Sequence, residues 1–293
     1  MRIVNPTFGT DPEFGIFENG VPVQIIDFIP GSKKEPCDIG EGCGVQPDNV
    51  MIETTQPPTN KKEDFIRYFN YCKNRIQEII RYNTNRNLDV VSISSATYKP
   101  EDIAHPIAQK FGCEPSFCIY TGNISPRPSP EEIGNLRSAG FHLHIGFDGL
   151  ASYEEIDFII FLCDILLGLP SIVIDEDENR RKLYGNAGDF RAKHLIDKNL
   201  TIVEYRTLGG TMHQNDELLG FCFDQLQYVV RKFNFYGSMQ QFLDIFNLNP
   251  GEIKDTIDTG NSEKATELIK KLDYATYRVL RDIKSRTLQL QPV

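Results

Sequence analysis

Three short segments of the chain place polar side chains two residues apart, with an apolar or small residue between them. Residues two apart in a β-strand point to the same face of the sheet. The segments therefore predict three strands, each presenting a pair of polar side chains on one face. Together they would bring carboxylates, imidazoles and a guanidinium to one surface, which suits a metal and polyphosphate site. The pairs are Asp11 with Glu13, His142 with His144, and Glu204 with Arg206.

The remaining pattern predicts an α+β fold. Asn19 and Gly20 form a strong hairpin signal between strands expected at 7–17 and 21–29. Apolar residues recur at helical spacing over 62–82, and a capping box at Ser152 begins a buried helix that ends near Gly168. We expect further strands at 49–55, 88–96, 139–148 and 200–208, a short helix within 98–112, loops at 30–47 and 123–135, an irregular polar stretch at 176–199, and only helices after residue 214.

The hairpin signal and the alternating strands favour an antiparallel sheet rather than a parallel one. We expect this sheet to be curved, with the site on its concave face and helices packed behind it. Residues 1–215 would form the catalytic part. Residues 216–293 would form a C-terminal helical flank that packs on it.

Charge narrows the range of ligands. The formal net charge is -10, which argues against a general nucleic-acid binder, because such proteins are usually basic. Basic residues nevertheless gather in one stretch of this acidic chain. A small anionic ligand fits that distribution better than a polymer backbone does. The stretch contains Arg180, Arg181, Lys182, Arg191, Lys193 and Arg206.

Targeting signals and cysteines indicate a cytoplasmic protein. The first residues show no signal peptide, and the apolar run at 156–169 is interrupted by two aspartates and is too short to span a bilayer. We expect a soluble, cytoplasmic protein with no membrane contact and no disulfides. The seven cysteines are irregularly spaced and are expected to be free thiols. A zinc site at Cys37 with Cys43, or Cys113 with Cys118, remains an alternative, although these spacings are wider than the usual motif.

Each polar pair also has a purely structural interpretation. Asp11 and Glu13 could belong to an exposed strand face, and Glu204 and Arg206 could form a cross-strand ion pair. The segment 178–191 mixes arginines with glycines, which suits phosphate binding but is equally typical of a charged loop. Several nucleotide and hydrolase motifs are missing from the sequence: the phosphate loop GxxxxGK[ST], the GxSxG elbow, HExxH, and Rossmann spacing at 40–44.

The order of the motifs adds a family resemblance. Gly9-Thr10-Asp11-Pro12-Glu13-Phe14 is followed by segments at 48–53, 111–115, 137–146, 184–191 and 203–209. Together they resemble the glutamine synthetase-like carboxylate-amine ligases, and among these the phage phiEco32-like COOH-NH2 ligases (amidoligase type 2). The resemblance spans roughly residues 7–215 and implies a glutamine synthetase-like sheet with the site on its concave face.

That resemblance implies a reaction and a set of cofactors. ATP would phosphorylate a carboxylate, and an amine would attack the acyl phosphate to give an amide, ADP and phosphate. The cofactors would be ATP and Mg²⁺, with Mn²⁺ as the alternative metal. The partners would be small-molecule or peptide carboxylates and amines, and a phage-encoded enzyme would act in the host cytoplasm.

The resemblance also assigns residues. It implies metal ligation by one set of side chains, although Asp11 stands where many relatives have Glu. It implies nucleotide contacts for a second set, and stabilisation of the transferring phosphoryl group by two arginines, with Glu53 also in the catalytic set. The implied metal ligands are Asp11, Glu13, Glu53, His142 and Glu204; the nucleotide contacts are His144, Arg180, Arg181, Tyr184 and Arg191; the phosphoryl-stabilising arginines are Arg191 and Arg206.

Two other functions remain open at this point. A metal-dependent hydrolase of an amide or phosphoester would also use histidines and carboxylates, with a metal-activated water as nucleophile. A non-catalytic phage structural protein could retain the sheet alone. The sequence does not define the acid, the amine, the adenine pocket or the oligomeric state. Specificity is expected from the loops at 30–47 and 123–135, because loops on a rigid scaffold often carry it.

Overall fold

The computed structural model describes residues 1–109, 116–126 and 129–289. Within these residues eleven strands form one sheet, and every pairing in it is antiparallel. Its order is β3-β4-β5-β1-β11-β13-β12-β8-β9, and β2 and β6 also pair with β1. A small second sheet pairs β7 with β10. The strands are β1 Val4–Glu18, β2 Val21–Pro22, β3 Cys37–Gly40, β4 Cys43–Asp48, β5 Met51–Thr55, β6 Asp89–Val91, β7 Ser95–Thr97, β8 Phe117–Cys118, β9 Asn123–Ile124, β10 Leu136–Ser138, β11 Phe141–Asp148, β12 Asp189–Leu195 and β13 Leu200–Tyr205.

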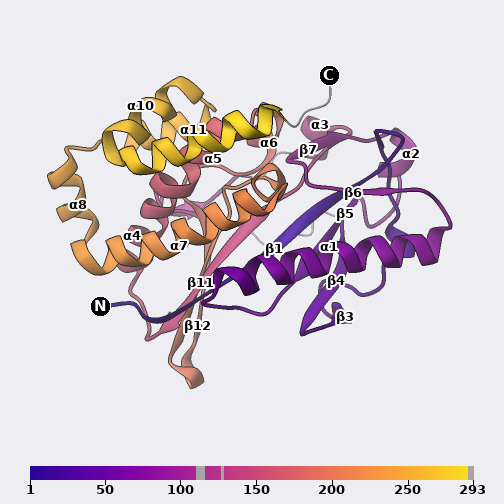
Figure 1. Cartoon of the computed structure of the whole chain (residues 1–293), viewed down its shortest axis with the longest axis horizontal. Coiled ribbons are helices and arrows are strands. Elements are labelled where there is room, and N and C mark those ends of the chain that lie inside the picture. The colour runs from indigo at the N-terminus through magenta and orange to yellow at the C-terminus, as the bar shows by residue number, and fades with distance from the viewer. Residues whose placement is uncertain (110–115, 127–128, 290–293) are drawn as a thin grey trace.

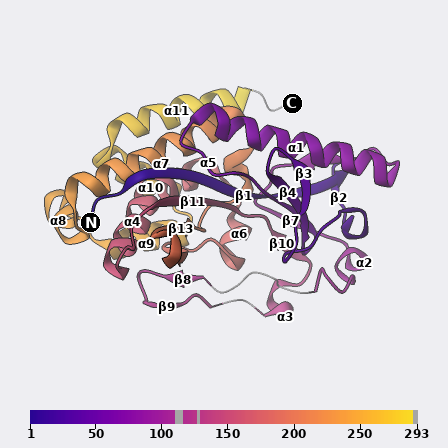
Figure 2. The same cartoon turned by 90° about the horizontal axis from the view of Figure 1, so that it is seen from below.

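Helices flank this sheet (Figure 1). The expected α+β class is therefore confirmed. Helices α1 and α7 lie along one side of β1 and β11, whereas β8, β9 and α3 lie on the other side (Figure 2). The α-helices are α1 Lys62–Thr84, α2 Pro100–Ile103, α3 Pro130–Ile133, α4 Tyr153–Cys163, α5 Leu169–Ile174, α6 Glu178–Leu183, α7 Asp216–Tyr236, α8 Met239–Phe246, α9 Pro250–Asp258, α10 Ser262–Leu272 and α11 Tyr274–Gln289. Three short 3₁₀ helices occupy Ile26–Phe28, Ile196–Lys198 and Gly210–His213, and a π-helical turn occupies Asp164–Gly168.

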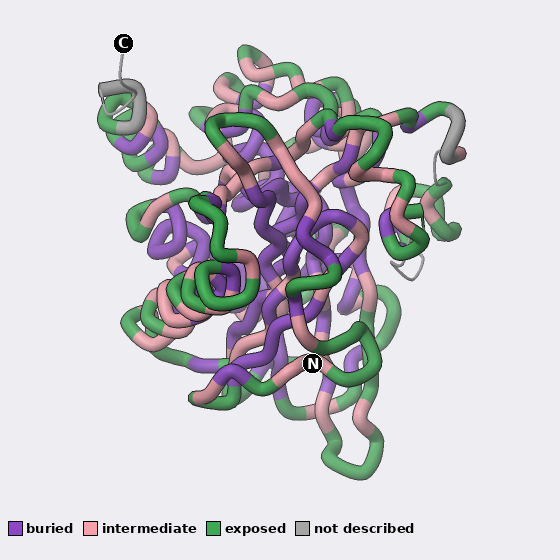
Figure 3. The backbone as a smooth tube through the Cα atoms, turned by 90° about the vertical axis from the view of Figure 1, so that its right-hand side faces the viewer, coloured by how far each residue is buried: buried purple, intermediate pink, exposed green. Residues whose placement is uncertain are grey.

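Aromatic side chains join the sheet to the helices. Phe8 of β1 meets Phe223 of α7 edge-on at 5.3 Å between ring centroids, and Phe14 meets Phe69 of α1 at 5.5 Å. Apolar residues three or four apart form the buried face of α1. The helix is capped by Asn85, whose backbone is in the left-handed conformation. Buried backbone runs through the centre of the molecule (Figure 3). The buried core includes residues of the sheet and of both helices.

The long apolar helix differs from the sequence expectation. The Ser152–Glu155 capping box is present, but the helix does not end near Gly168. It passes through the π-helical turn into α5, so Tyr153–Ile174 is 22 residues long and is apolar enough to cross a membrane by length and composition. The expectation that this run is too short is therefore wrong. However, 89% of its apolar 18-residue window is buried inside the protein, which is typical of a core helix.

Two further segments differ from the secondary structure that the sequence predicts. The stretch 21–29 is predicted as a strand, but only Val21–Pro22 is one. A 3₁₀ turn at Ile26–Phe28 follows instead, and Ile25, Ile26 and Ile29 around it are all buried. The stretch 30–47 was expected to be a loop, but it contains the β3–β4 hairpin. Glu41 and Gly42 both have positive φ at its turn, so Glu-Gly does here what Asn-Gly does elsewhere.

Other helix and strand boundaries also differ from the predicted ones, because they depend on contacts between distant segments. The strand expected at 88–96 is split between β6 and β7, which belong to different sheets. The irregular stretch 176–199 contains α6 and β12, and the loop 123–135 contains β9 and α3, with 127–128 outside the described residues. The helices after residue 214 are confirmed. The six described cysteines are free thiols, and Cys113 lies outside the described residues.

Candidate active site

The three predicted polar pairs lie on one face of three neighbouring strands, β1, β11 and β13, with Arg206 directly after the last of them. Register places Asp11 of β1 opposite His142 of β11, and His144 opposite Glu204 of β13. The residues between them, such as Leu143 and Tyr205, are almost fully buried on the opposite face. Alternation along each strand thus produces the pairs, and pairing between strands brings the pairs together. We call this surface the polar face.

A cluster of metal-ligating atoms forms at its centre. One ligand atom from each of Asp11, His144 and Glu204 can be chosen so that all lie within 4.8 Å of one another. His142 Nδ1 lies 3.2 Å from Asp11 Oδ1 and 3.5 Å from Glu204 Oε1, and His144 Nε2 lies 3.6 Å from Asp11 Oδ1. We call these four residues the ligand cluster.

The ligand cluster fits a divalent cation. Asp11 Oδ1, His142 Nδ1 and His144 Nε2 are buried and have no hydrogen-bond partner, although buried polar atoms normally have one. A cation bound between them would satisfy all three atoms at once. Carboxylate oxygens suit Mg²⁺ and Mn²⁺, whereas imidazole nitrogens shift the preference toward transition metals such as Mn²⁺.

The histidines and Asp11 influence one another electrostatically. Burial opposes ionisation of Asp11, but the two imidazoles hold the pKa of its carboxyl well below the usual range. Burial lowers the pKa of His142, and nearby Arg206 lowers it further. For His144, burial acts in the same direction, but Asp11 outweighs it and the pKa is raised. The cluster therefore has an ionised carboxylate beside two differently tuned imidazoles.

A second row of carboxylates lies beside the ligand cluster. Glu13 is opposite Glu53 of β5, and Glu53 is opposite Gln46 of β4, whose Nε2 donates to Glu53 Oε2 at 2.7 Å. Burial and then Asp48 raise the pKa of Glu13 to about 7. Burial, followed by the surrounding carboxylates, raises the pKa of Glu53 well above its usual value. Such a group of buried carboxyls is suited to a positively charged partner.

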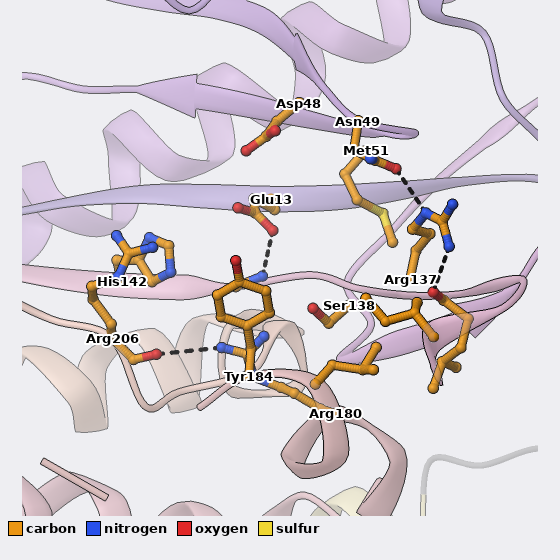
Figure 4. A pocket seen from close by; sticks show the side chains of 14 residues that line it. Glu13, Asp48, Asn49, Met51, Arg137, Ser138, His142, Arg180, Tyr184 and Arg206 are labelled. Carbon is orange, nitrogen blue, oxygen red and sulfur yellow. Dashed lines mark hydrogen bonds between the residues drawn. The ribbon is translucent and has the colours of Figure 1, made fainter. Parts of the chain in front are cut away.

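A glycine makes room for this arrangement. The Gly140 N–H donates to Glu13 Oε2 at 2.6 Å (Figure 4). A Cβ at Gly140 would lie 2.7 Å from His142 Nε2, so any larger residue would displace the imidazole. Gly140 belongs to the sequence motif at 137–146, but the sequence pattern assigns it no role. Its contribution depends on a contact between strands that the sequence does not show.

Two arginines flank the ligand cluster as expected. Arg206 is buried; its Nη1 donates to Glu204 Oε1, and its Nε donates to Ser116 Oγ at 2.9 Å. Arg191 of β12 is opposite Glu204, and its Nη1 lies 3.7 Å from Glu204 Oε2. The Nε of Arg191 is buried without a hydrogen-bond partner. Positive charge is therefore held immediately beside the predicted metal ligands.

The other predicted nucleotide contacts are arranged differently. Arg180 is buried, and its guanidinium donates to Ala139 O at 3.0 Å and Leu208 O at 2.7 Å. It thereby ties the start of β11 to the chain after β13. Arg181 donates to the Asp177 and Asp175 carbonyls and lines neither cavity that reaches the ligand cluster. Tyr184 lines one of them.

Among the described residues, a polar and an apolar cavity both reach the cluster. The polar cavity, of about 370 Å³, has basic and acidic walls. The apolar cavity, of about 60 Å³, is shown in Figure 4 and has several aliphatic walls. Glu13, Asp48, His142 and Arg206 line both. The polar cavity is lined by Asp11, Glu13, Lys33, Lys34, Gln46, Asp48, Glu53, His142, Arg191 and Arg206.

The sequence analysis assigned no role to four polar residues of this site, which are Lys33, Lys34, Gln46 and Asp48. Asp48 is buried and pairs with Lys33 at 2.6 Å, and Gln46 orients Glu53. Gln46 and Asp48 are two apart on one strand, which is the same signal that found the other pairs. That signal was overlooked because 30–47 was interpreted as a loop.

Comparisons with known proteins give only solved structures of low similarity. No protein-family model and no curated protein matches the sequence. Among solved structures, the chain is similar to a bifunctional glutathione synthetase from Pasteurella multocida, with 9% identity, 97% of this chain and 52% of that chain covered, and a TM-score of 0.41. It is also similar to GmaS without ligand (10% identity, 98% and 70% covered, TM-score 0.43) and to a GmaS/ADP complex (10%, 98% and 71%, 0.42). The chain spans about half the length of the glutathione synthetase. We therefore base the function on the site itself.

Proposed function

We propose that this protein is an ATP-dependent carboxylate-amine ligase that forms an amide through an acyl phosphate. One observation carries the proposal. Three buried ligand atoms without hydrogen-bond partners meet beside two arginines on the polar face. Phosphoryl transfer needs divalent cations and fixed positive charge more than it needs covalent catalysis. The polar face would correspond to the concave face of a glutamine synthetase-like sheet.

The ligand cluster would hold Mg²⁺ or Mn²⁺, which would neutralise charge on the nucleotide phosphates. His144 belongs to this cluster in our proposal, although the family resemblance assigned it to the phosphates, because its Nε2 meets Asp11. Glu13 and Glu53 stay predicted cation ligands in the neighbouring row. ATP phosphates would enter the polar cavity, where Lys33, Lys34 and the two arginines provide positive charge.

The arginines would act on the transferring phosphoryl group. A carboxylate oxygen of the acid attacks the γ-phosphorus, the bond to the β–γ bridging oxygen breaks, and ADP leaves. The amine nitrogen then attacks the acyl carbon, its proton is lost, and phosphate leaves. Arg206 is held rigidly by Glu204 and Ser116, so it is oriented before the reaction. Arg191 has a donor available, and preorganised charge of this kind is typically the largest catalytic contribution.

The test is ADP release from ATP with Mg²⁺ or Mn²⁺, in the presence of pooled amino acids and peptides. We expect release that requires both an acid and an amine. Arg206→Lys should reduce it strongly, because a single ammonium cannot replace a guanidinium that contacts two groups. Arg281→Gln is the matched control, since Arg281 is exposed on α11. Absence of nucleotide binding by the folded protein, with either metal, would overturn the proposal.

A metal-dependent hydrolase is the second candidate, and a specific observation favours it. Two imidazoles belong to the ligand cluster, and imidazole is a good ligand for metals that activate water. Hydrolysis of amides or phosphoesters without ATP, supported by Mn²⁺ or Zn²⁺, would favour this candidate. Arg191 and Arg206 have no evident task in that reaction, so we place it second.

A further inference from the structure

The apolar cavity differs in chemistry from the rest of the site. Its aliphatic walls come from four separate elements: Met51 begins β5, Ile133 ends α3, Leu136 begins β10 and Leu183 ends α6. Tyr184 follows Leu183 and lines the same space (Figure 4). The opposite end of the cavity reaches Glu13, His142 and Arg206 at the polar face. A molecule bound here would therefore have an apolar end and a polar end.

The size of the cavity limits the apolar group. A volume of about 60 Å³ holds roughly four water-sized groups, at about 15 Å³ for each. A chain of about four carbon atoms fits this space. Burying such a chain against Met51, Leu136 and Leu183 would contribute about a fourfold gain in affinity for each methylene group.

The charges around the cavity favour a cationic head group. Three arginines line the cavity, and most of their donors are directed at other groups. Arg137 donates to the Asn49 side chain and to backbone carbonyls, the two Nη atoms of Arg180 donate to backbone carbonyls, and Arg206 donates to Glu204 and Ser116. A carboxylate in this cavity would therefore find most of these donors occupied, although Arg180 Nε is a buried donor without a hydrogen bond. Glu13, in contrast, accepts from the Gly140 amide on Oε2, and a carboxylate can accept about four hydrogen bonds.

We propose that the apolar cavity binds the amine substrate, a primary amine with an apolar substituent of about four carbons, whose ammonium group faces Glu13. In this assignment the cation at Glu13 is the ammonium group, and the metal lies at the ligand cluster. As an assignment of the amine substrate, this rests on the proposed ligase function. The nucleotide phosphates and the amine would then approach the polar face from different cavities. The acid would lie between them, at the residues that line both.

The first experiment measures binding without ATP, by saturation-transfer NMR and calorimetry. The probes are n-alkylamines from methylamine to hexylamine, the n-alkanoates of the same lengths, and n-butanol. We expect amine affinity to rise about fourfold per methylene up to about four carbons and then to level off or fall. Butylamine should bind more tightly than butanol or butyrate. Tighter binding of the alkanoates, or amine affinity that is independent of length, would overturn the proposal.

Two cavity variants test the location. Leu136→Trp should fill the space and weaken butylamine at least tenfold while changing methylamine little. Met51→Ala should enlarge it and move the preferred length to longer amines, so the proposal stays testable if one variant fails to fold. Leu150→Trp is the control, because Leu150 is an exposed leucine outside the cavity. Equal effects of Leu136→Trp and Leu150→Trp on butylamine would contradict the proposed location.

The ligase proposal is checked separately by ADP release. Length-dependent amine binding without ADP formation from any acid would leave the amine site in place and refute the ligase. Acid- and amine-dependent ADP release that shows no dependence on amine length would retain the ligase and refute the amine site.

Discussion

Two polar clusters lie on opposite faces of the sheet at β13, and they differ in how their buried atoms find hydrogen-bond partners. Glu204 faces the ligand cluster, while its neighbour Tyr205 faces the helices. Behind the sheet, Asp164 of the π-helical turn accepts from Tyr205 Oη at 2.7 Å, Tyr120 Oη at 2.8 Å and the Gly188 N–H at 3.2 Å. The Asp164 carboxylate thus receives its hydrogen bonds from the protein itself. We call this group the Asp164 cluster.

Several atoms of the ligand cluster lack such hydrogen bonds. Three of its buried ligand atoms have no hydrogen-bond partner. A buried polar group without a partner lowers stability by about 1–3 kcal/mol, so the ligand cluster reduces stability until something binds. The comparison teaches that burial of ionisable groups does not by itself indicate function. The distinction lies in whether the protein's own donors and acceptors complete the group.

The largest expected effect concerns activity. Asp11→Asn removes the charge that meets both imidazoles, so we expect ADP release to fall on the order of 10²–10³-fold. The free energy of unfolding should fall only modestly: Oδ1 has no hydrogen-bond donor to lose, but the imidazoles that lower the pKa of Asp11 stabilise its charged form in the folded state. Turnover and urea denaturation of the same preparation provide the check. A variant that is strongly destabilised would remove the contrast between the two clusters.

The reverse result is expected for Asp164→Ala. Two tyrosine hydroxyls and one amide would lose their acceptor, so the free energy of unfolding should fall by about 3 kcal/mol or more. Nucleotide binding by the protein that remains folded should persist. Urea denaturation measures the first effect and calorimetry the second. A fully stable variant would mean that the Asp164 cluster is not structural.

Metal addition should stabilise one cluster and leave the other unaffected. At a Mn²⁺ concentration 100 times the dissociation constant, binding to the native state alone adds about 2.7 kcal/mol to the free energy of unfolding. We expect this gain in the wild type and in Tyr120→Phe, and its loss in His144→Ala. Thermal unfolding with and without metal measures it. Equal stabilisation of wild type and His144→Ala would place the metal elsewhere.

A pH dependence of stability belongs to the Asp164 cluster, and its effect is small over any single pH unit. Burial raises the pKa of Asp164 from 3.8 to about 7, so between these values the folded state binds more protons than the unfolded state. The stabilising contribution of this carboxyl is complete below pH 3.8 and is lost as pH rises through about 7. The slope is at most about 1.4 kcal/mol per pH unit. Asp164→Asn should lack this component, as denaturation at several pH values would reveal. An unchanged slope in the variant would contradict the assignment.

The polar pairs and the C-terminal helices could be predicted from the sequence because they depend on local periodicity. Asp11 with Glu13 and His142 with His144 share a face wherever their strands pair, since side chains alternate with a period of two. Helix α1 likewise follows from apolar residues at helical spacing. These features need no knowledge of neighbouring strands.

Tertiary structure alone decided which pairs meet and which side chains are available. Strand register puts Asp11 beside His142, and the β3–β4 hairpin adds Gln46 and Asp48. Arg180 follows the sequence pattern of a phosphate ligand, yet its Nη1 and Nη2 donate to backbone carbonyls that are distant in sequence. Asp164 resembles an interruption of an apolar run until Tyr120 and Tyr205 supply its hydrogen bonds. The physical reason is the same throughout: a side chain's direction is set by its own strand or helix, but its partners are set by contacts between distant segments.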